Sequence, residues 1–192
     1  MPLPAVAAPV APEKPPMVSL KQEIEQERPF ASIEEEVFLN LLRSSDYLNR
    51  AFQRRTRGYG VTSTQYNVLR ILRGAQPEGL TCASIGRRMI TAEPDITRLL
   101  NRLKALRLIR QHRDRHDRRV VWTQITETGL ELLATMDPVI ERAPSELLGH
   151  MRPQELAELS RLLELARKED AMAAAENGNG ALRSAQAEAV TS

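Results

Sequence analysis

The chain of 192 residues has an apolar fraction of 42% and a formal net charge of +2, and its length allows one buried core. No stretch approaches 18 consecutive apolar residues, and the first 17 residues hold six prolines and no basic start, which argues against a membrane span and a signal peptide. The lone cysteine, Cys82, excludes an internal disulfide and is typical of a reducing cytoplasm, where we expect the protein to reside.

The charges are distributed unevenly along the chain. Residues 41–119 carry eighteen Lys and Arg against six Asp and Glu, residues 1–40 three against seven, and residues 120–192 six against twelve. A basic middle between acidic ends is typical of a nucleic-acid-binding protein. Residues 1–17, rich in Pro and Ala, and residues 171–192 are predicted to be disordered tails, which leaves a single domain over 18–170.

Helical periodicity begins with a short segment over residues 19–30 and continues in a long helix over about 33–57, which Gly58 and Gly60 end. Thr62 and Gln65 form a predicted capping box for a third helix. The apolar residues of the long helix recur at three- and four-residue spacing: Ile33, Val37, Leu41, Tyr47, Leu48, Ala51 and Phe52. In the third helix the predicted inward side chains are Tyr66, Leu69 and Leu72.

Two short helices follow, joined by a tight turn. Thr81 is a candidate cap for the first, which carries Ile85 and Met89 inward and stops around Ile90. The second restarts at residues 91–94, with Pro94 in its first turn, where proline is tolerated. Its predicted core stripe is Ile96, Leu99, Leu100, Leu103 and Leu106.

Residues 108–112 and 120–125 are predicted to be two strands of a hairpin, joined by the polar segment 113–118. Thr126 then caps a long helix over about 127–149 that kinks at Pro138, and Pro153 opens a last helix over 153–169. The side chains of this last helix that we expect to face inward are Leu156, Leu159, Leu162, Leu163 and Ala166.

This order predicts a mainly α fold with a small β-hairpin wing. It is a winged helix-turn-helix over about 61–126, between helical regions over about 18–57 and 127–169. A 3.6-residue period turns one face of the helix after Pro94 outward, and the hairpin is narrow enough to reach a minor groove. The predicted DNA-binding residues are Thr62, Ser63, Thr64, Thr81, Ser84, Asp95, Thr97, Arg98, Asn101, Arg102, Arg113, Arg115, His116, Arg118 and Arg119.

Nine Arg and Lys lie between Arg98 and Arg119, against only two aspartates, and such self-repulsion favours an anionic partner over a merely solvated surface. The two aspartates, Asp114 and Asp117, are predicted to support the wing. They can hydrogen-bond to turn amides or pair with Arg119.

Three segments resemble the MarR (multiple antibiotic resistance regulator) family of bacterial transcription factors, over about residues 33–170. They are residues 64–72, residues 95–103 running on to 108–110, and Asp117-Arg-Arg119 with Ile125-Thr-Glu-Thr-Gly129. The resemblance implies a homodimer whose outer helices, the dimerisation region over about 18–57 and 127–169, interdigitate. Its recognition helices and wings grip a pseudo-palindromic double-stranded operator. The groove-reading positions then fall on Thr97 and Arg98, and the wing pair on Asp117 and Arg119.

The resemblance also implies a repressor released by a small phenol or aromatic acid, although activation would need the same DNA contacts. An apolar pocket with a cationic rim would include Tyr47, Arg50, Tyr66 and Arg70, but Tyr66 at helical spacing also fits a core residue. The chain departs from the family at Glu93-Pro94-Asp95, where relatives have a small hydroxyl or glutamine, so an acidic residue faces the groove. Its carboxylate can accept a bond from a cytosine amine.

Other readings stay open. Cys82 after a helix cap could act as a redox-sensing thiol or as a small apolar filler. His112 and His116 lie on the hairpin without further ligands, so no metal or cofactor is expected. No Gly-rich phosphate loop or nucleophile elbow is present, which argues against an enzyme, and a non-DNA protein-interaction module is the remaining alternative.

Overall fold

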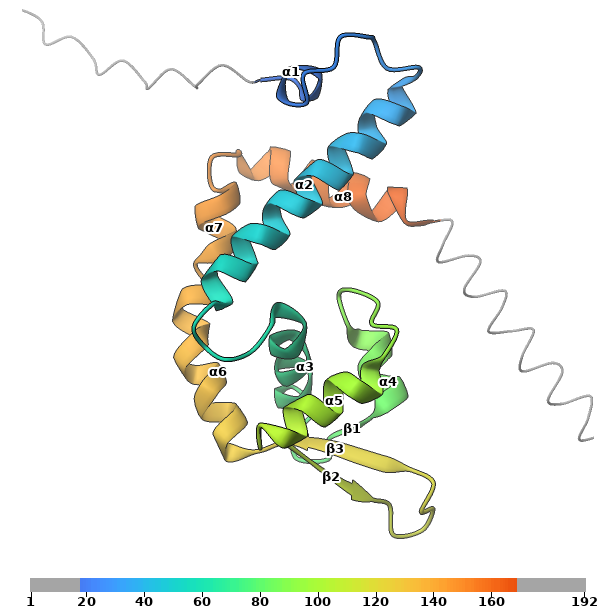
Figure 1. Ribbon diagram of the computed structural model, residues 1–192, viewed down its shortest axis with the longest axis vertical. Helices are drawn as coiled ribbons and strands as arrows, with labels where there is room; N and C mark the ends of the chain where they lie inside the picture. The colour runs from blue at the N-terminus through green and yellow to red at the C-terminus, as the bar shows by residue number, and fades with distance from the viewer. Residues whose placement is uncertain (1–17, 169–192) are drawn as a thin grey trace, which may run out of the picture. The chain divides into compact units, whose positions relative to one another are not determined.

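The computed structural model describes residues 18–168, so the two predicted disordered tails lie outside the described residues. The chain divides into two compact units, residues 1–54 and 55–192, and each is described by itself (Figure 1). Within the described residues, no helix is both long enough and apolar enough to cross a bilayer.

The first unit holds α1 (Leu20–Glu23) and most of α2 (Ile33–Thr56). Ser19 caps α1 through a capping box with Gln22, and the helix is shorter than the periodicity predicted because Glu25 adopts a positive φ of 52°. The apolar residues of α2 are mostly exposed: 65% for Ile33, 50% for Val37 and 60% for Phe38. Helical spacing predicted an apolar stripe on this helix; its first half is exposed, whereas Ala51 is buried and Leu48 and Phe52 are half-buried.

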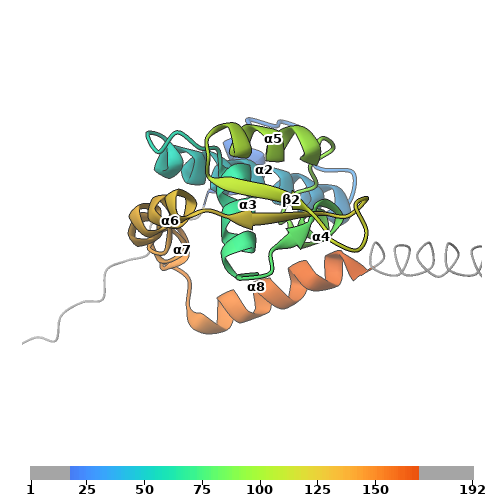
Figure 2. The same cartoon turned by 90° about the horizontal axis from the view of Figure 1, so that it is seen from below.

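The second unit is mainly helical with one small sheet, and this confirms the predicted fold class. Its helices are α3 (Ser63–Arg73), α4 (Cys82–Arg88), α5 (Ile96–Ala105), α6 (Glu127–Ile140), α7 (Ala143–Leu148) and α8 (Pro153–Ala166). Its strands are β1 (Leu80–Thr81), β2 (Ile109–Arg113) and β3 (Val121–Ile125). Figure 2 shows α3, α4 and α5 gathered around the sheet. The core lies among these helices, α6 and the sheet, and its fully buried side chains include Leu69, Leu72, Ile85, Leu100, Leu103, Leu133 and Met136.

The antiparallel sheet has the order β1-β3-β2. The register pairs Ile109 with Ile125 at the base and Arg113 with Val121 near the tip, so both predicted strands are confirmed within one residue. Strand β1 was not predicted, and its two residues pair with Thr123 and Trp122. A strand of two residues is too short to show an alternating sequence pattern, and it forms only because it can pair with the edge of β3.

Local capping connects the sheet to α6. The backbone N–H of Thr126 donates to the carbonyl of Leu108 at 3.0 Å, and its hydroxyl donates to the carbonyl of Arg107 at 2.7 Å. The same hydroxyl accepts from the N–H of Gly129 at 3.2 Å, as an N-cap residue does. Gly129 therefore lies against the backbone of Leu108, a contact that only a residue without a Cβ allows.

Several sequence expectations about the helices are wrong. The long helix expected over 127–149 is two helices: Pro138 lies inside α6, and the break comes after Ile140. Leu106 is 48% exposed instead of buried, because α5 ends at Ala105 and Leu106 is its C-cap, followed by a residue with positive φ.

The last helix also differs from expectation. In α8 no side chain is buried, and of the leucines expected to face inward Leu159 is 37% and Leu162 45% exposed. Periodicity predicts that an apolar face will be covered, but it does not say whether the cover comes from the same chain.

Candidate nucleic-acid interface

Helix α5 presents a polar face to solvent and an apolar face to the core. Leu99, Leu100 and Leu103 are buried. The residues predicted to face outward are all exposed, namely Thr97, Arg98, Asn101 and Arg102. The helix therefore offers two arginine side chains and two hydrogen-bonding side chains on one open surface, the combination that suits a major groove.

The start of α5 differs from the sequence expectation. Pro94 lies before the helix and not in its first turn, because Asp95 is the N-cap. The Oδ1 atom of Asp95 accepts from the backbone N–H of Arg98 at 2.9 Å. An aspartate at this position satisfies an otherwise unpaired helix N–H, which gives the acidic residue a structural role beside any contact with a base.

Asp114 organises the hairpin tip. Its Oδ1 accepts from the backbone N–H groups of His116 at 2.8 Å and Asp117 at 3.1 Å, and its Oδ2 accepts from the indole N–H of Trp122 at 2.9 Å. Hydrogen bonds from the Asp117 amide, the Trp122 indole and the His116 amide lower the pKa of the Asp114 carboxyl to about 2. Asp114 is therefore an ionised brace at neutral pH.

Asp117 closes the other side of the same turn. Its Oδ1 accepts from the backbone N–H of Arg119 at 2.9 Å, and its carbonyl accepts from the N–H of Val120 at 3.0 Å. Of the two roles expected for the aspartates, the structure bears out hydrogen bonds to turn amides. Each carboxylate fixes the backbone from which the neighbouring arginines project.

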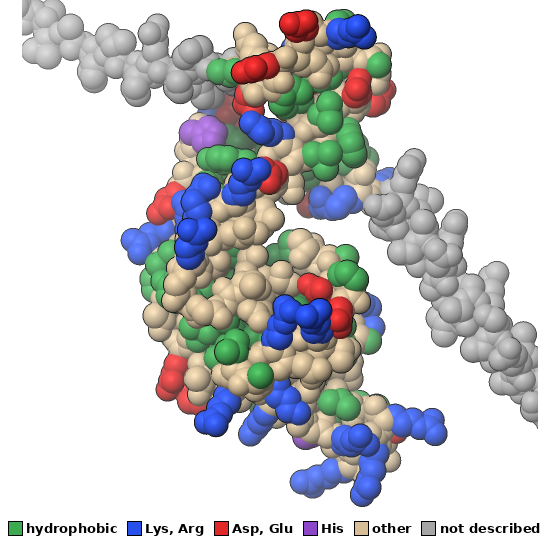
Figure 3. Space-filling model, viewed as in Figure 1, with side chains coloured by type: hydrophobic (Ala, Val, Ile, Leu, Met, Phe, Trp, Pro, Cys, Tyr) green, Lys and Arg blue, Asp and Glu red, His purple; other side chains and the backbone are tan. Residues whose placement is uncertain are grey.

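The tip is strongly basic and open. Arg113, Asp114, Arg115 and Arg118 line an open hollow at the turn. Every predicted DNA-binding residue of the hairpin is exposed: Arg113, Arg115, His116, Arg118 and Arg119. Figure 3 shows the Lys and Arg side chains gathered over the hairpin. Such a patch attracts polyanions and repels itself when no partner is bound.

The predicted hydroxyl residues are engaged in helix caps. Thr62 caps α3 and exchanges hydrogen bonds with Gln65, at 2.9 Å and 3.2 Å, as the capping box predicted. Thr81 caps α4, where its hydroxyl accepts from the N–H of Ser84 at 3.3 Å. Ser63 and Thr64 occupy the first two positions of α3 and are half-buried.

Sequence reasoning missed three residues of the winged helix-turn-helix lobe, residues 61–126: Arg87, Arg88 and Trp122. Arg87 and Arg88 are exposed in the last turn of α4, and the guanidinium of Arg87 donates to the Ser84 hydroxyl at 3.1 Å. Both lie within residues 41–119, the segment with eighteen Lys and Arg, and this excess of positive charge could have indicated them. Trp122 was placed on a strand face, but nothing local to it indicates that its indole reaches Asp114 eight positions earlier.

The residues of the predicted effector pocket belong to both units. In the first, Arg50 pairs with Asp46 at 2.8 Å. In the second, Tyr66 is 2% exposed and its hydroxyl donates to Asp137 at 3.3 Å, while the Arg70 guanidinium lies 6.0 Å from its ring centroid. Burial raises the pKa of the Tyr66 hydroxyl. Tyr66 thus has the core role that its spacing also allowed.

The remaining candidates are the Cys82 thiol and the side chains that could bind a metal ion. Cys82 is a half-buried free thiol at the first position of α4. Across residues 18–168, no three His, Cys, Asp or Glu side chains group closely enough to hold a metal ion.

Comparison with known proteins agrees with this geometry. The model of the MarR family matches residues 59–120. The chain is 26% identical over 129 residues to the HTH-type transcriptional regulator MhqR of Bacillus subtilis, covering 66% of this chain and 86% of the relative. A crystal structure of a MarR transcription factor from Planctomyces limnophilus is 36% identical, with a TM-score of 0.55, and the match covers 71% of this chain and 99% of that one.

A third relative is BpsR of Bordetella bronchiseptica, whose DNA binding is regulated by 6-hydroxynicotinic acid. It is 26% identical with a TM-score of 0.61, over 69% of this chain and 98% of that one. The matched proteins are regulators and not enzymes, which confirms the expectation that this chain is not an enzyme. The helix caps, the hairpin held by Asp114 and Asp117, and the similarity to these regulators agree with one another. The chain belongs to the MarR family of transcriptional regulators.

Proposed function

We propose that the protein is a homodimer that binds a pseudo-palindromic double-stranded DNA operator and represses transcription until a small phenol or aromatic acid releases it. The observation that carries this proposal is the basic surface of one lobe, where the exposed face of α5 and the hairpin tip braced by Asp114 and Asp117 both present arginines. Such a regulator acts in the cytoplasm, with the DNA.

The two arginine-bearing elements suit different parts of the duplex. Helix α5 can enter the major groove, where Arg98 and Arg102 offer forks to guanine edges or phosphates and Asn101 offers an amide to adenine. The hairpin can reach the adjacent minor groove or its flanking phosphates, with Arg115, Arg118 or Arg119 inserted. Because the tip backbone is held by its own carboxylates, these arginines lose less conformational freedom on binding.

The exposed apolar faces support the dimer. Phe38 on α2 belongs to an exposed apolar stripe in the first unit, and Leu162 on α8 belongs to another in the second unit. Contiguous apolar stripes of this kind mark protein interfaces. A two-fold dimer would read two half-sites about 34 Å apart, one turn of the duplex.

An aromatic acid or phenol is the ligand class that we propose for release. The precedent is BpsR, which responds to 6-hydroxynicotinic acid. In the second unit the cationic side chain that we expect to serve is Arg70, whose guanidinium lies 6.0 Å from the ring centroid of Tyr66. Because Tyr66 is 2% exposed and its hydroxyl already donates to Asp137, we expect the exposed Arg70 guanidinium to meet the acid or phenolate of the ligand.

The test is a fluorescence-anisotropy titration of the full chain against DNA flanking its own gene, at several salt concentrations, with random DNA as competitor. Arg119→Ala should weaken binding about tenfold and lower the salt slope by about 1. Arg28→Ala, an exposed arginine outside the basic lobe, is the matched control and should leave both unchanged. Wild-type protein without salt-sensitive, competitor-resistant binding would refute the proposal.

A further inference from the structure

Asp137 ties α6 to α3 and takes no part in the basic surface. Its side chain is 19% exposed, and its Oδ1 accepts from the Tyr66 hydroxyl at 3.3 Å. Its Oδ2 forms an ion pair with the Arg73 guanidinium. Both partners lie on α3, one two turns after the other, so the carboxylate fixes the rotation of α6 as well as its distance from α3.

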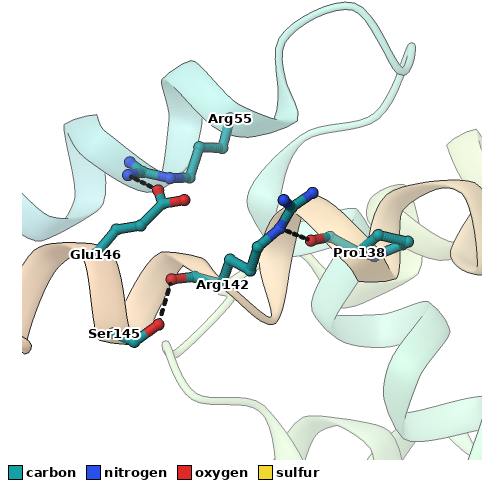
Figure 4. A network of polar contacts seen from close by, with 5 residues as sticks. All are labelled: Arg55, Pro138, Arg142, Ser145 and Glu146. Atoms are coloured by element: carbon teal, nitrogen blue, oxygen red, sulfur yellow. Dashed lines mark hydrogen bonds and ion pairs between the residues drawn. The ribbon is translucent and has the colours of Figure 1, made fainter.

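A second set of contacts fixes the turn that follows (Figure 4). The Nε of Arg142 donates to the carbonyl of Pro138 at 2.7 Å, and the Ser145 hydroxyl donates to the carbonyl of Arg142 at 2.9 Å. Arg55, at the start of the second unit, pairs with Glu146 of α7 at 2.8 Å. The Arg142 side chain thus binds a carbonyl in the last turn of α6, and the Arg142 carbonyl accepts from both the Ser145 hydroxyl and the Glu146 N–H. Side chains therefore help to hold the α6–α7 turn.

Helix α6 is the covalent route from the wing to the last helices. It begins at the Thr126 cap, directly after β3, and ends at the turn to α7, beyond which α8 carries its uncovered leucines. In the proposed dimer, therefore, the DNA-binding lobe is connected to the interface through α6, and Asp137 lies close to its far end. A small rotation of α6 at Asp137 therefore produces a larger displacement at the other end of the helix.

We infer that Asp137 is a positioning residue for operator binding, which sets the separation of the two DNA-binding lobes and so the half-site spacing that the dimer accepts. This inference rests on the proposed function. One added base pair rotates a half-site by about 34–36° and moves it by about 3.4 Å. A rigid pair of lobes therefore accepts one spacing, whereas lobes that swing about a loosened α3–α6 contact accept several.

The test compares operators whose half-sites are brought one base pair closer, left unchanged or moved one base pair apart, together with a single half-site duplex. Asp137→Asn removes the charge that Arg73 meets, and Glu131→Gln removes the same charge from an exposed position of the same helix. In Asp137→Asn we expect the affinity ratio between the best and the shifted spacings to fall about 2- to 30-fold, with half-site affinity unchanged. Glu131→Gln should keep the wild-type ratio.

A purely structural role would lower thermal stability and all affinities together, without changing this ratio. Arg73→Gln, which leaves the hydrogen bond between Tyr66 and Asp137, gives the same test if Asp137→Asn does not fold. A wild-type spacing ratio in the folded variant, or an equal loss in Glu131→Gln, overturns the inference and leaves the proposed function standing. Wild-type protein that binds no operator overturns the proposed function, and the inference with it.

Discussion

Gly129 and Gly86 both lie inside helices, but a methyl group added at each would meet different surroundings. A Cβ at position 129 would lie 2.7 Å from Cγ1 of Ile125 and closer still to the carbonyl oxygen of Leu108. A Cβ at position 86 would meet Cδ1 of Ile96 at 3.5 Å, an ordinary van der Waals distance. The same substitution, Gly to Ala, should therefore have opposite effects at the two positions.

The expected magnitudes follow from two opposing contributions. Alanine is about 1 kcal/mol more favourable than glycine inside a helix, so Gly86→Ala should raise the free energy of unfolding by up to about 1 kcal/mol. At position 129 this gain is opposed by overpacking, which costs about 1–3 kcal/mol. The cost lies at the upper end because the clashing Leu108 carbonyl is held by the Thr126 amide, so Gly129→Ala should destabilise by about 2 kcal/mol.

Thermal melts followed by circular dichroism measure this difference. In a chain of this size 1 kcal/mol corresponds to about 2–4 °C, so Gly129→Ala should melt about 4–8 °C below wild type and Gly86→Ala about 2–4 °C above it. All samples need the same protomer concentration, because the melting temperature of a dimer depends on it. A Gly129→Ala protein as stable as wild type would refute the reasoning from close approach, and so would equal shifts in both variants.

Four further outcomes are expected. Asp114→Asn should shift the NMR resonance of the Trp122 indole proton and weaken operator binding; an unmoved resonance would contradict the brace. Because the folded pKa of Asp114 is lowered to about 2, its contribution to wing stability is complete above about pH 4 and is lost as the pH falls toward 2. The fluorescence of Trp122, the only tryptophan, should accordingly change within that window and stay constant near neutral pH. Arg102→Ala should reduce the salt slope of DNA binding by about 1, and an unchanged slope would remove Arg102 from the phosphate contacts. Leu162→Glu should convert the protein to a monomer in analytical ultracentrifugation, and a retained dimer would exclude α8 from the interface.

The basic surface that we propose faces DNA was predictable because its signals are local or additive. Exposure of Arg98 and Arg102 follows from helical period once the leucines of α5 are assigned to the core. The positive charge of the hairpin is a property of composition that folding does not alter. The braces were only half predictable: turn amides are always near Asp114 and Asp117, whereas the indole partner of Asp114 requires strand pairing across the hairpin.

The sequence by itself determined three helix starts, those of α3, α4 and α6. Thr62, Thr81 and Thr126 each cap a helix through a hydrogen bond to a backbone N–H three residues on, so the donor and acceptor lie within one turn of chain. It also determined the two wing strands, because alternating apolar residues on both sides of a polar turn favour a hairpin wherever the rest of the chain lies.

Only the tertiary structure decided which distant segments meet. Strand β1 exists because β3 accepts it, and Asp137 meets Tyr66 from 71 positions away. Periodicity also predicted an apolar face on α8 but could not say that Leu159 and Leu162 stay uncovered in the protomer. The physical reason is the same in each case: capping and period act over one helical turn, whereas the partner of a strand edge, a buried carboxylate or an apolar stripe depends on where the remaining chain, or a second copy, comes to lie.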